Sequence, residues 1–207
     1  MSGTTETQLQ GIVRSLHLRH HFLGVYDKSF PGFLNPHRPA SAIVNTGSRA
    51  SGGMHWIGFA FDPQGQRCYM FDPFGWTDKD LWNLYRVKYD AFLRRTGLSQ
   101  GDRCVNLIRS VQAVQCPCSA ACGLFCTLFI ASFDKYRQDP MNNNPIIDTV
   151  EGVNLEHLYD VRYRSVLHGN QERLYLWLHD NSTYFRNHES LLRSATAINS
   201  LPHQSDE

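Results

Sequence analysis

The first half of the chain carries short apolar runs of the kind that form β-strands. SAIVNT (41–46) is followed by HWIGFAF (55–61), in which apolar positions alternate, and then by RCYMFD (67–72). DPQGQ (62–66), between the last two runs, consists of turn-forming residues, so these runs are predicted to pair as a β-hairpin. The Pro-Phe-Gly sequence at 73–75 predicts a sharp exit from the second strand.

The second half shows the three- and four-residue spacing of amphipathic helices. A helix capped by Thr77 or Asp78 is predicted to run to Arg95. Its apolar positions are Leu81, Leu84, Tyr85, Tyr89, Phe92 and Leu93. The apolar run 120–131 predicts a buried helix, and helical periodicity returns in 171–180 and 190–198. Strands early and helices mostly late predict an α+β fold with a mixed central sheet.

The chain has the length and apolar content of one ordinary domain. It has 207 residues, of which 42% are hydrophobic, and contains neither a repeat nor a long linker. We therefore expect a single compact domain over residues 1–207, with roughly the last eight residues as a loose tail. The longest apolar run is far short of the ~20 residues needed to cross a bilayer. The first ten residues, MSGTTETQLQ, have neither the basic flank nor the apolar stretch of a signal peptide. We therefore expect the chain to stay inside the cell.

The charge balance is nearly neutral but locally uneven. The formal net charge is +1, and sixteen of the twenty cations are arginines. Between Thr7 and Phe61 there are five cations against Asp27 alone, a local net charge of +4. These cations are Arg14, Arg19, Lys28, Arg38 and Arg49. This segment is one candidate for a basic face, and acids from elsewhere in the fold are the alternative that would balance it.

Six cysteines in a chain of this kind predict mostly free thiols. Four of them lie within eleven residues: Cys116, Cys118, Cys122 and Cys126. A structural zinc site usually needs ligand pairs of the C-x₂₋₄-C type separated by a longer span. Because the cluster has a lone C-x-C and its last pair lies in an apolar helix, no metal site is predicted.

Cys122 is the candidate nucleophile. If Ser119 caps the following helix, Cys122 occupies its third position, where free N–H groups and the helix dipole favour a thiolate. Gly123 would let a substrate backbone approach closely. The alternative is that Cys122 is a small apolar residue of a buried helix, as Cys126 is.

His55 is the candidate base and Asp72 its partner. With a four-residue turn at 62–65, Phe61 would pair with Gln66 and His55 would lie directly opposite Asp72. The carboxylate could then orient one ring nitrogen while the other faces the thiol. A lone strand histidine is more often structural, so this interpretation depends on all three residues together.

Gln115 lies seven residues before Cys122, and its side-chain amide is a candidate donor to a developing oxyanion beside the Cys122 N–H. Simple solvation of a loop glutamine is the alternative. The chain has no P-loop, G-x-G-x-x-G, G-x-S-x-G or H-E-x-x-H motif, which excludes the commonest nucleotide-binding, serine hydrolase and zinc protease readings.

Dispersed motifs make the chain resemble the adenovirus endopeptidase family, which are viral cysteine proteases. The motifs are FLGVYDKSFPGF, AIVNT, GGMHW, FDPFG, FLRR, DRC, SAACGLFC, NQERLY, YFRNH and RSATA, from about Phe22 to Ala197. The resemblance implies a papain-like active site with a rearranged chain order. It places the catalytic histidine on His55, the acidic residue on Asp72, the oxyanion glutamine on Gln115 and the nucleophile on Cys122. Familiar members have glutamate where this chain has Asp72.

The resemblance also implies substrates and activators. The family cleaves virion precursor proteins after glycine, at aliphatic-x-Gly-x or aliphatic-x-Gly-Gly sites. It is activated by viral DNA and by a capsid-derived peptide, which in familiar members forms a disulfide with the cysteine of the DRC stretch, here Cys104. We accordingly expect a monomer in the host nucleus and the virion that binds double-stranded DNA without sequence specificity, with no metal, small-molecule cofactor or membrane partner.

Two other functions remain open at this point. A deubiquitinase or ubiquitin-like-protein protease acting on host conjugates would use the same triad. A catalytically idle, DNA-binding capsid component would need no reactive thiol.

Overall fold

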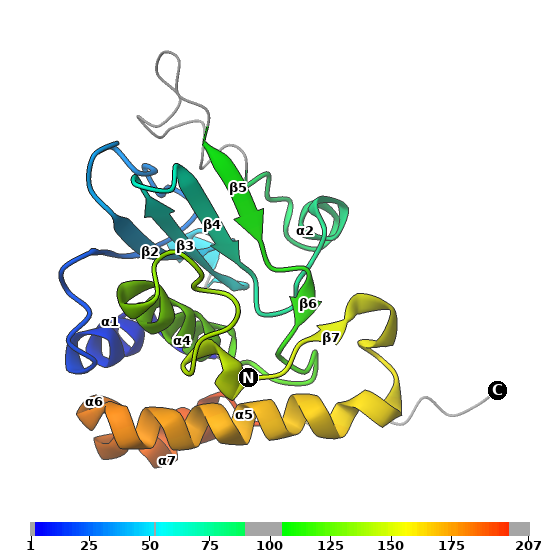
Figure 1. Cartoon of the computed structure of the whole chain (residues 1–207). Coiled ribbons are helices and arrows are strands. Elements are labelled where there is room, and N and C mark those ends of the chain that lie inside the picture. The colour runs from blue at the N-terminus through cyan, green and yellow to red at the C-terminus, as the bar shows by residue number, and fades with distance from the viewer. Residues whose placement is uncertain (1–2, 52, 90–104, 199–207) are drawn as a thin grey trace.

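The computed structural model describes residues 3–51, 53–89 and 105–198, and a five-stranded sheet lies at the centre of these segments (Figure 1). The strands follow one another across the sheet as β1 (Phe22–Tyr26), β2 (Ala40–Asn45), β3 (Trp56–Asp62), β4 (Arg67–Phe71) and β5 (Asn106–Arg109). β1 runs parallel to β2 and β4 runs parallel to β5, while β3 is antiparallel to both of its neighbours. The predicted α+β class with a mixed central sheet is therefore confirmed.

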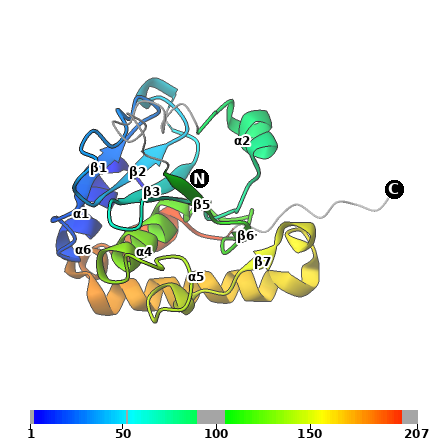
Figure 2. The same cartoon turned by 45° about the horizontal axis from the view of Figure 1, so that its top comes forward.

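Helices cover one face of the sheet in two layers. α4 (Cys122–Lys135) packs against β2 and β3, and the long α5 (Val161–Asn181) lies beyond it, as both views show (Figures 1 and 2). The other α-helices of the described segments are α1 (Glu6–Ser15), α2 (Asp78–Tyr85), α6 (Thr183–Asn187) and α7 (Glu189–Ala195). A short ladder joins β6 (Gln112–Ala113) to β7 (Val153–Asn154). Of the helices in the described segments, none is long and apolar enough to cross a membrane.

The residue pattern of β3 explains why α4 can approach the sheet so closely. Ile57, Phe59 and Phe61 belong to one core cluster, whereas Ala60 belongs to the cluster around α4. A Cβ on Gly58 would lie 2.6 Å from the Phe129 ring of α4, so only glycine fits there. The sheet is therefore buried on both faces, with the small side chains of β3 facing the helix.

The β3–β4 hairpin forms as predicted but in a different register. Asp62 pairs with Arg67, so the turn contains residues 63–66 and not 62–65. The Asp62 carboxylate accepts hydrogen bonds from the N–H groups of Gln64 and Gly65, and Gln66 takes a left-handed conformation (φ 50°). Because Asp62 stabilises the turn from the strand side, pairing is shifted by two residues and each side chain stays on its expected face.

Helix α2 is shorter than the sequence predicts. Thr77 caps it through a capping box with Asp80, as expected, but Arg86 adopts a left-handed conformation (φ 56°) and ends it at Tyr85. The prediction of a helix to Arg95 is therefore wrong for residues 86–89. Phe92, Leu93 and Arg95 lie outside the described residues, as does the predicted tail.

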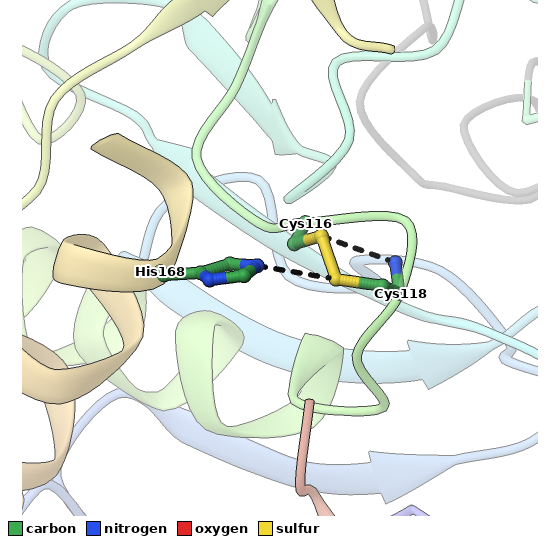
Figure 3. A group of neighbouring side chains, drawn as sticks. All are labelled: Cys116, Cys118 and His168. Atoms are coloured by element: carbon green, nitrogen blue, oxygen red, sulfur yellow. Dashed lines mark hydrogen bonds between the residues drawn. A yellow bond between two sulfur atoms is a disulfide. The ribbon is translucent and has the colours of Figure 1, made fainter. Parts of the chain in front are cut away.

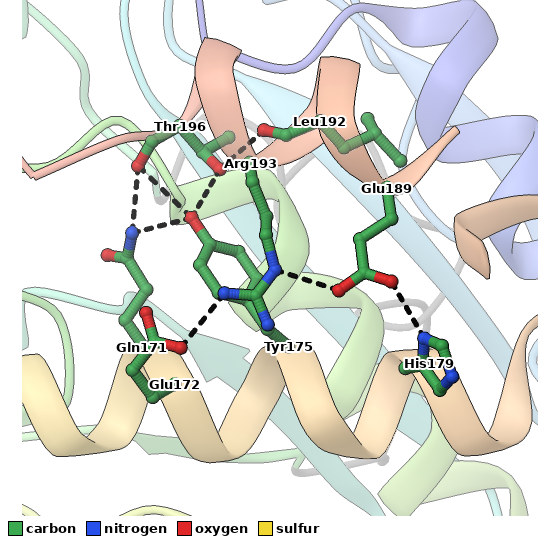
Figure 4. A network of polar contacts seen from close by, with 8 residues as sticks. All are labelled: Gln171, Glu172, Tyr175, His179, Glu189, Leu192, Arg193 and Thr196. Carbon is green, nitrogen blue, oxygen red and sulfur yellow. Dashed lines mark hydrogen bonds and ion pairs between the residues drawn. The ribbon is translucent and has the colours of Figure 1, made fainter. Parts of the chain in front are cut away.

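A polar network joins α7 and the residue that follows it, Thr196, to α5 (Figure 4). The Tyr175 hydroxyl hydrogen-bonds with Oγ1 of Thr196 (2.7 Å), and Gln171 donates to the Thr196 carbonyl oxygen (2.8 Å). Arg193 pairs with Glu172 and Glu189 at 2.9 and 2.8 Å. These contacts hold α7 against α5, where Leu192 and Thr196 are fully buried.

Candidate active site

His55 and Asp72 form a buried pair at one end of the β3–β4 hairpin. His55 comes directly before β3 and Asp72 directly after β4, and Nε2 of His55 lies 2.8 Å from Oδ1 of Asp72. Each side chain is 1% exposed. The register observed in the hairpin makes the two positions diagonal neighbours, so the prediction that they lie directly opposite is wrong. The contact survives because a shift of two residues keeps both side chains on one face.

The backbone around Asp72 fixes the direction of its carboxylate. Oδ1 accepts a second hydrogen bond from the Phe74 N–H (2.9 Å), and Ser110 hydrogen-bonds with both the N–H and the carbonyl oxygen of Asp72. Oδ2 is buried without a hydrogen-bond partner among the described residues. The carboxylate therefore directs one oxygen at His55, and its negative charge is little screened.

Two aromatic rings hold the imidazole of His55 between them. Phe74 stacks on it at a centroid distance of 5.0 Å, and Tyr85 stacks at 5.1 Å with an interplanar angle of 18°. Neither residue was predicted from the sequence to be part of the site. Phe74 could have been expected near His55, because it lies two residues after Asp72 in the FDPFG turn. Tyr85 could not, because its place depends on how α2 packs.

Protonation of His55 is strongly favoured. Burial lowers the pKa of His55, but the charge and hydrogen bond of Asp72, together with the Cys122 thiol, raise it to about 10. Because Nε2 bonds to Asp72, Nδ1 is the ring nitrogen left for the thiol. The site thus places an imidazolium between a carboxylate and a cysteine.

Cys122 is the first residue of α4. Ala121 is the N-cap and makes no side-chain cap bond, so the prediction that Ser119 caps the helix and puts Cys122 at its third position is wrong. Ser119 is instead engaged with Gln115 in the preceding loop. The expectation that matters for reactivity is met, because Cys122 still lies among the free N–H groups of the helix start.

Gly123 has a packing role that differs from the predicted one. A Cβ at this position would lie 2.2 Å from Oγ1 of Thr4 and 2.9 Å from Cδ2 of Leu9. Glycine is therefore required so that α4 can pack against the segment leading into α1. The prediction that Gly123 admits a substrate backbone is not what the structure shows.

Gln115 is buried beside Cys122 in the same cleft. Its Nε2 donates to the Ser119 carbonyl oxygen at 2.9 Å and to the Ser119 hydroxyl at 3.3 Å, while Oε1 has no partner among the described residues. The shorter contact holds the amide in place. Because Gln115 is buried and its amide is bonded to Ser119, solvation of a loop glutamine does not describe this residue.

A cleft of about 580 Å³ is lined by all the candidate catalytic residues except Asp72. His55, Cys122 and Gln115 line it, with Tyr85 and Trp56 among its aromatic walls. The segment from Gly3 to Glu6 also contributes to the lining, which the sequence analysis did not foresee. Strand ends, a helix start and a loop thus bring the side chains of three distant segments to one cavity.

The other described thiols lack this environment. Cys68 and Cys126 are free and buried. Burial raises the pKa of the Cys68 thiol to about 12, and burial together with the charges of Cys122 and Asp72 raises that of Cys126 well above its ordinary value. Cys104, expected to bind the activating peptide, lies outside the described residues.

Cys116 and Cys118 form a disulfide with each other. Within the described ranges, they and His168 are the one group whose ligand atoms lie close enough to hold a metal ion, within 4.8 Å of one another. The two sulfurs are bonded together, so neither is available as a thiolate ligand in this state. His168 is distant in sequence, and no spacing signal could have linked it to these cysteines.

The N-terminal basic segment is only partly balanced. Arg14, Arg19 and Arg38 are exposed, whereas Arg49 pairs with Glu6 at 3.0 Å. Glu6 lies just outside the segment counted as basic, so one acid from elsewhere does balance part of the excess.

The arrangement defines the class of the protein. A histidine held by a carboxylate, a thiol at a helix start and a buried amide around one cleft are the groups of a peptide-bond hydrolase, that is, a protease. The family model described as adenovirus endoprotease matches residues 22–200. The chain therefore belongs to the adenovirus endoprotease family.

Individual relatives agree over nearly the whole chain. It is 70% identical over 202 residues to "Protease" of Fowl adenovirus A serotype 1 (strain CELO / Phelps), with 98% of each chain covered. It is 68% identical to "Protease" of Avian adenovirus 8, again with 98% of each covered. Against "Protease" of Human adenovirus B serotype 3 it is 43% identical, with 98% of this chain and 97% of that one covered. The protein is a viral protease.

Proposed function

We propose that the protein is a cysteine endopeptidase in which Cys122 is the nucleophile and His55 the general acid and base. The observation that carries this proposal is the buried His55–Asp72 pair, with its 2.8 Å contact, next to Cys122 at the start of α4. The chain order of these groups, His, Asp, Gln and Cys, differs from that of papain, while their roles are the same.

The first step is attack by the Cys122 thiolate on the carbonyl carbon of the scissile bond. The His55 imidazolium stabilises the thiolate beforehand and then gives its proton to the leaving amine. The electron pair of the broken C–N bond goes to that amine, and a thioester remains on Cys122. Neutral His55 next takes a proton from water, whose oxygen attacks the thioester. The C–S bond breaks, its electron pair leaves on Cys122 as the thiolate, and His55 keeps the proton, which restores the imidazolium–thiolate pair.

Asp72 orients the imidazole and stabilises its charged form. Its backbone hydrogen bonds fix the carboxylate before substrate arrives, so no reorganisation is needed during the reaction. Aspartate in place of the family's usual glutamate shortens the side chain by one methylene. The 2.8 Å contact supports the view that the orienting role is retained.

Gln115 and the backbone N–H of Cys122 are the proposed oxyanion donors. Gln115 lines the cleft, and only its longer contact with the Ser119 hydroxyl has to be given up to release an N–H. The N–H of Cys122 is among those at the start of α4 that have no partner within the helix. Both donors act on the charge that develops on the substrate oxygen.

For the substrate, we propose virion precursor proteins cut after glycine at aliphatic-x-Gly-x or aliphatic-x-Gly-Gly sites. Support comes from the family resemblance and from the open cleft of about 580 Å³ beside Cys122. We propose on the same basis that viral DNA and a capsid-derived peptide activate the enzyme, the peptide through a disulfide to Cys104. The proposed setting is a monomer in the host nucleus and the virion, without a metal or small-molecule cofactor.

A deubiquitinase or ubiquitin-like-protein protease would use the same residues, because its substrates also end in glycine. Profiling cleavage of virion precursor peptides against ubiquitin-type conjugates separates these two functions. Faster cleavage of the conjugates would favour the second.

Thiol labelling tests the proposed nucleophile. We expect an iodoacetamide-type probe to modify Cys122 at pH 7 at least tenfold faster than Cys68 or Cys126, whose raised pKa values keep them protonated. Mass spectrometry of the digested protein locates the modified residue, and the experiment is run with and without DNA. Labelling of Cys122 no faster than Cys126 would reject Cys122 as the nucleophile.

A further inference from the structure

The Cys116–Cys118 disulfide lies in the loop that carries Gln115 (Figure 3). Its Cα atoms are 5.1 Å apart, and the N–H of Cys118 donates to Sγ of Cys116 at 3.3 Å. The bond closes a ring across a single intervening residue, Pro117. Such a short ring removes little chain entropy from the unfolded state, so the bond is poorly explained as a staple for the whole fold.

The disulfide is bracketed by a contact of the active site. Gln115 directly precedes it and Ser119 directly follows it, and these two residues are joined by the 2.9 Å bond from Nε2 to the Ser119 carbonyl oxygen. Gln115, Pro117 and Ser119 all line the cleft. The disulfide therefore constrains the loop that positions the proposed oxyanion donor.

His168 of α5 supplies a base at the same place. Its Nε2 lies 3.5 Å from Sγ of Cys118, and the ring is half-buried, so the sulfur lies next to a side chain that reaches solvent (Figure 3). Burial and the charge of Arg164 lower the pKa of His168, which keeps the imidazole neutral and able to accept a proton. A neutral base beside a cysteine promotes formation of the thiolate that carries out thiol–disulfide exchange.

We propose that Cys116 and Cys118 form a reversible redox site that exchanges with low-molecular-weight thiols and disulfides of the glutathione class, and that its oxidised form holds Gln115 in its working position. The redox chemistry stands on the sulfur and imidazole geometry, whereas the effect on Gln115 rests on the proposed function.

Reduction consumes two equivalents of thiol. The thiolate of a first glutathione attacks Sγ of Cys116, the Cys116–Cys118 bond breaks, and its electron pair leaves on Sγ of Cys118, which is then protonated. A second glutathione thiolate attacks the glutathione sulfur of the mixed disulfide and releases Cys116. The products are two protein thiols and one oxidised glutathione. Oxidation is the reverse, with His168 accepting the proton of the Cys118 thiol.

The redox site is tested first in a chain that has lost the proposed nucleophile. The full-length Cys122→Ser variant is equilibrated at a series of ratios of reduced to oxidised glutathione, quenched with acid and alkylated, and each cysteine is read by mass spectrometry. We expect Cys116 and Cys118 to convert together, while the buried Cys68 and Cys126 stay reduced as internal controls. A pair that stays bonded in excess dithiol, or stays as thiols in oxidised glutathione alone, would overturn the proposal.

The role of His168 has its own control. His168→Gln keeps a polar side chain but removes the base, so oxidation of the reduced pair by oxidised glutathione should slow by about tenfold or more. His179→Gln, the same change eleven residues further along α5, is the matched control and should leave that rate within about twofold. An unchanged rate in His168→Gln would show that the histidine takes no part.

The effect on the active site is measured with the chain that retains Cys122. Cys116 and Cys118 are first converted fully to the disulfide or fully to the thiols, and the redox buffer is then removed. The number of active Cys122 thiols is counted with an irreversible alkylating inhibitor, and kcat is expressed per active thiol. Reduction should lower kcat by about tenfold with KM little changed, because a small displacement of an oxyanion donor removes stabilisation of the transition state. The kcat of the Cys116→Ser/Cys118→Ser double variant should equal that of the reduced form and should be the same after either redox treatment.

These arms separate the two proposals. Equal kcat in both redox states would overturn the effect on Gln115 and leave Cys122 as nucleophile untouched. Cleavage by the Cys122→Ser variant would instead reject the proposed function, and the glutathione titration would still decide the redox site.

Discussion

Oδ1 of Asp72 lies 2.8 Å from Nε2 of His55, although the two residues occupy diagonal and not opposite positions across the β3–β4 hairpin. The contact is possible because both residues lie just beyond the ends of their strands, where the backbone is free to turn. Phe74 helps to fix it by donating its N–H to the same carboxylate oxygen. The pair is thus built into the Asp72–Gly75 turn and exists before any substrate binds.

Removing the charge of Asp72 should impair catalysis without abolishing the fold. Asp72→Asn keeps the size and one carbonyl oxygen but loses the charge that favours the imidazolium, so we expect kcat to fall by well over tenfold. Asp72→Glu should be mild, since it restores the side chain usual in the family. Peptide cleavage by the three proteins measures this, and an Asn variant as active as the native chain would show that the carboxylate takes no part.

The raised pKa of His55 predicts how stability depends on pH. A group that binds its proton more tightly when folded contributes stability that is fully present below its unfolded pKa, about 6.5, and is lost as pH rises through its folded value. For His55 that folded pKa is about 10. The free energy of unfolding should therefore decrease between about pH 6.5 and 10 because of this residue.

The matched measurement uses urea unfolding at a series of pH values for the native chain and for Asp72→Asn. Other groups titrate in this range in both proteins, so the difference between the two curves isolates the His55–Asp72 pair. We expect the Asn variant to lose less stability over this interval. Parallel curves would contradict the assignment of a protonated His55 held by Asp72.

The proposed DNA interaction should be electrostatic and independent of base sequence. Arg14, Arg19 and Arg38 are exposed in the segment with excess positive charge. Each phosphate neutralised contributes about −0.9 to the slope of log affinity against log salt concentration on duplex DNA. Removing the charge at each of the three should flatten that slope by up to about one unit, while peptide cleavage without DNA stays unchanged.

Salt titrations with the native chain and the triple variant carry this test. Arg162 and Arg193 are less suited to binding phosphate because they already pair with Asp160 and with Glu172 and Glu189. A slope unaltered by the triple change would place the DNA site elsewhere, and binding without salt dependence would exclude phosphate contacts.

The sequence was informative where a signal is local. The alternation in β3 and the apolar run of α4 identify the central sheet and the helix that carries Cys122, and Thr77 caps α2 as its spacing predicts. The strand register was wrong, because Asp62 stabilises the turn from the strand side. That error did not move His55 away from Asp72, since a shift of two residues preserves the face.

What the sequence could not supply depends on tertiary contacts. Ser119 is a residue type that favours the N-cap position, yet Ala121 is the N-cap of α4, and the Ser119 hydroxyl accepts from Nε2 of Gln115 and from the N–H of Ala121. Tyr85, the last residue of α2, stacks on the His55 ring, which comes from a position thirty residues earlier in the chain. His168 approaches Cys118 from a helix fifty residues further along the chain. These contacts form in the folded chain, and no local sequence pattern predicts them.

The most direct test of the account is cleavage of a Leu-x-Gly-Gly peptide by Cys122→Ser and, as its matched control, by Cys126→Ser. Both changes replace a buried thiol of α4 by a hydroxyl, and thermal unfolding of both variants checks that the fold persists. Because this site does not deprotonate a hydroxyl, the account predicts that Cys122→Ser loses cleavage and that Cys126→Ser retains it. Retention of more than a few per cent of native activity by a folded Cys122→Ser variant would contradict the central claim.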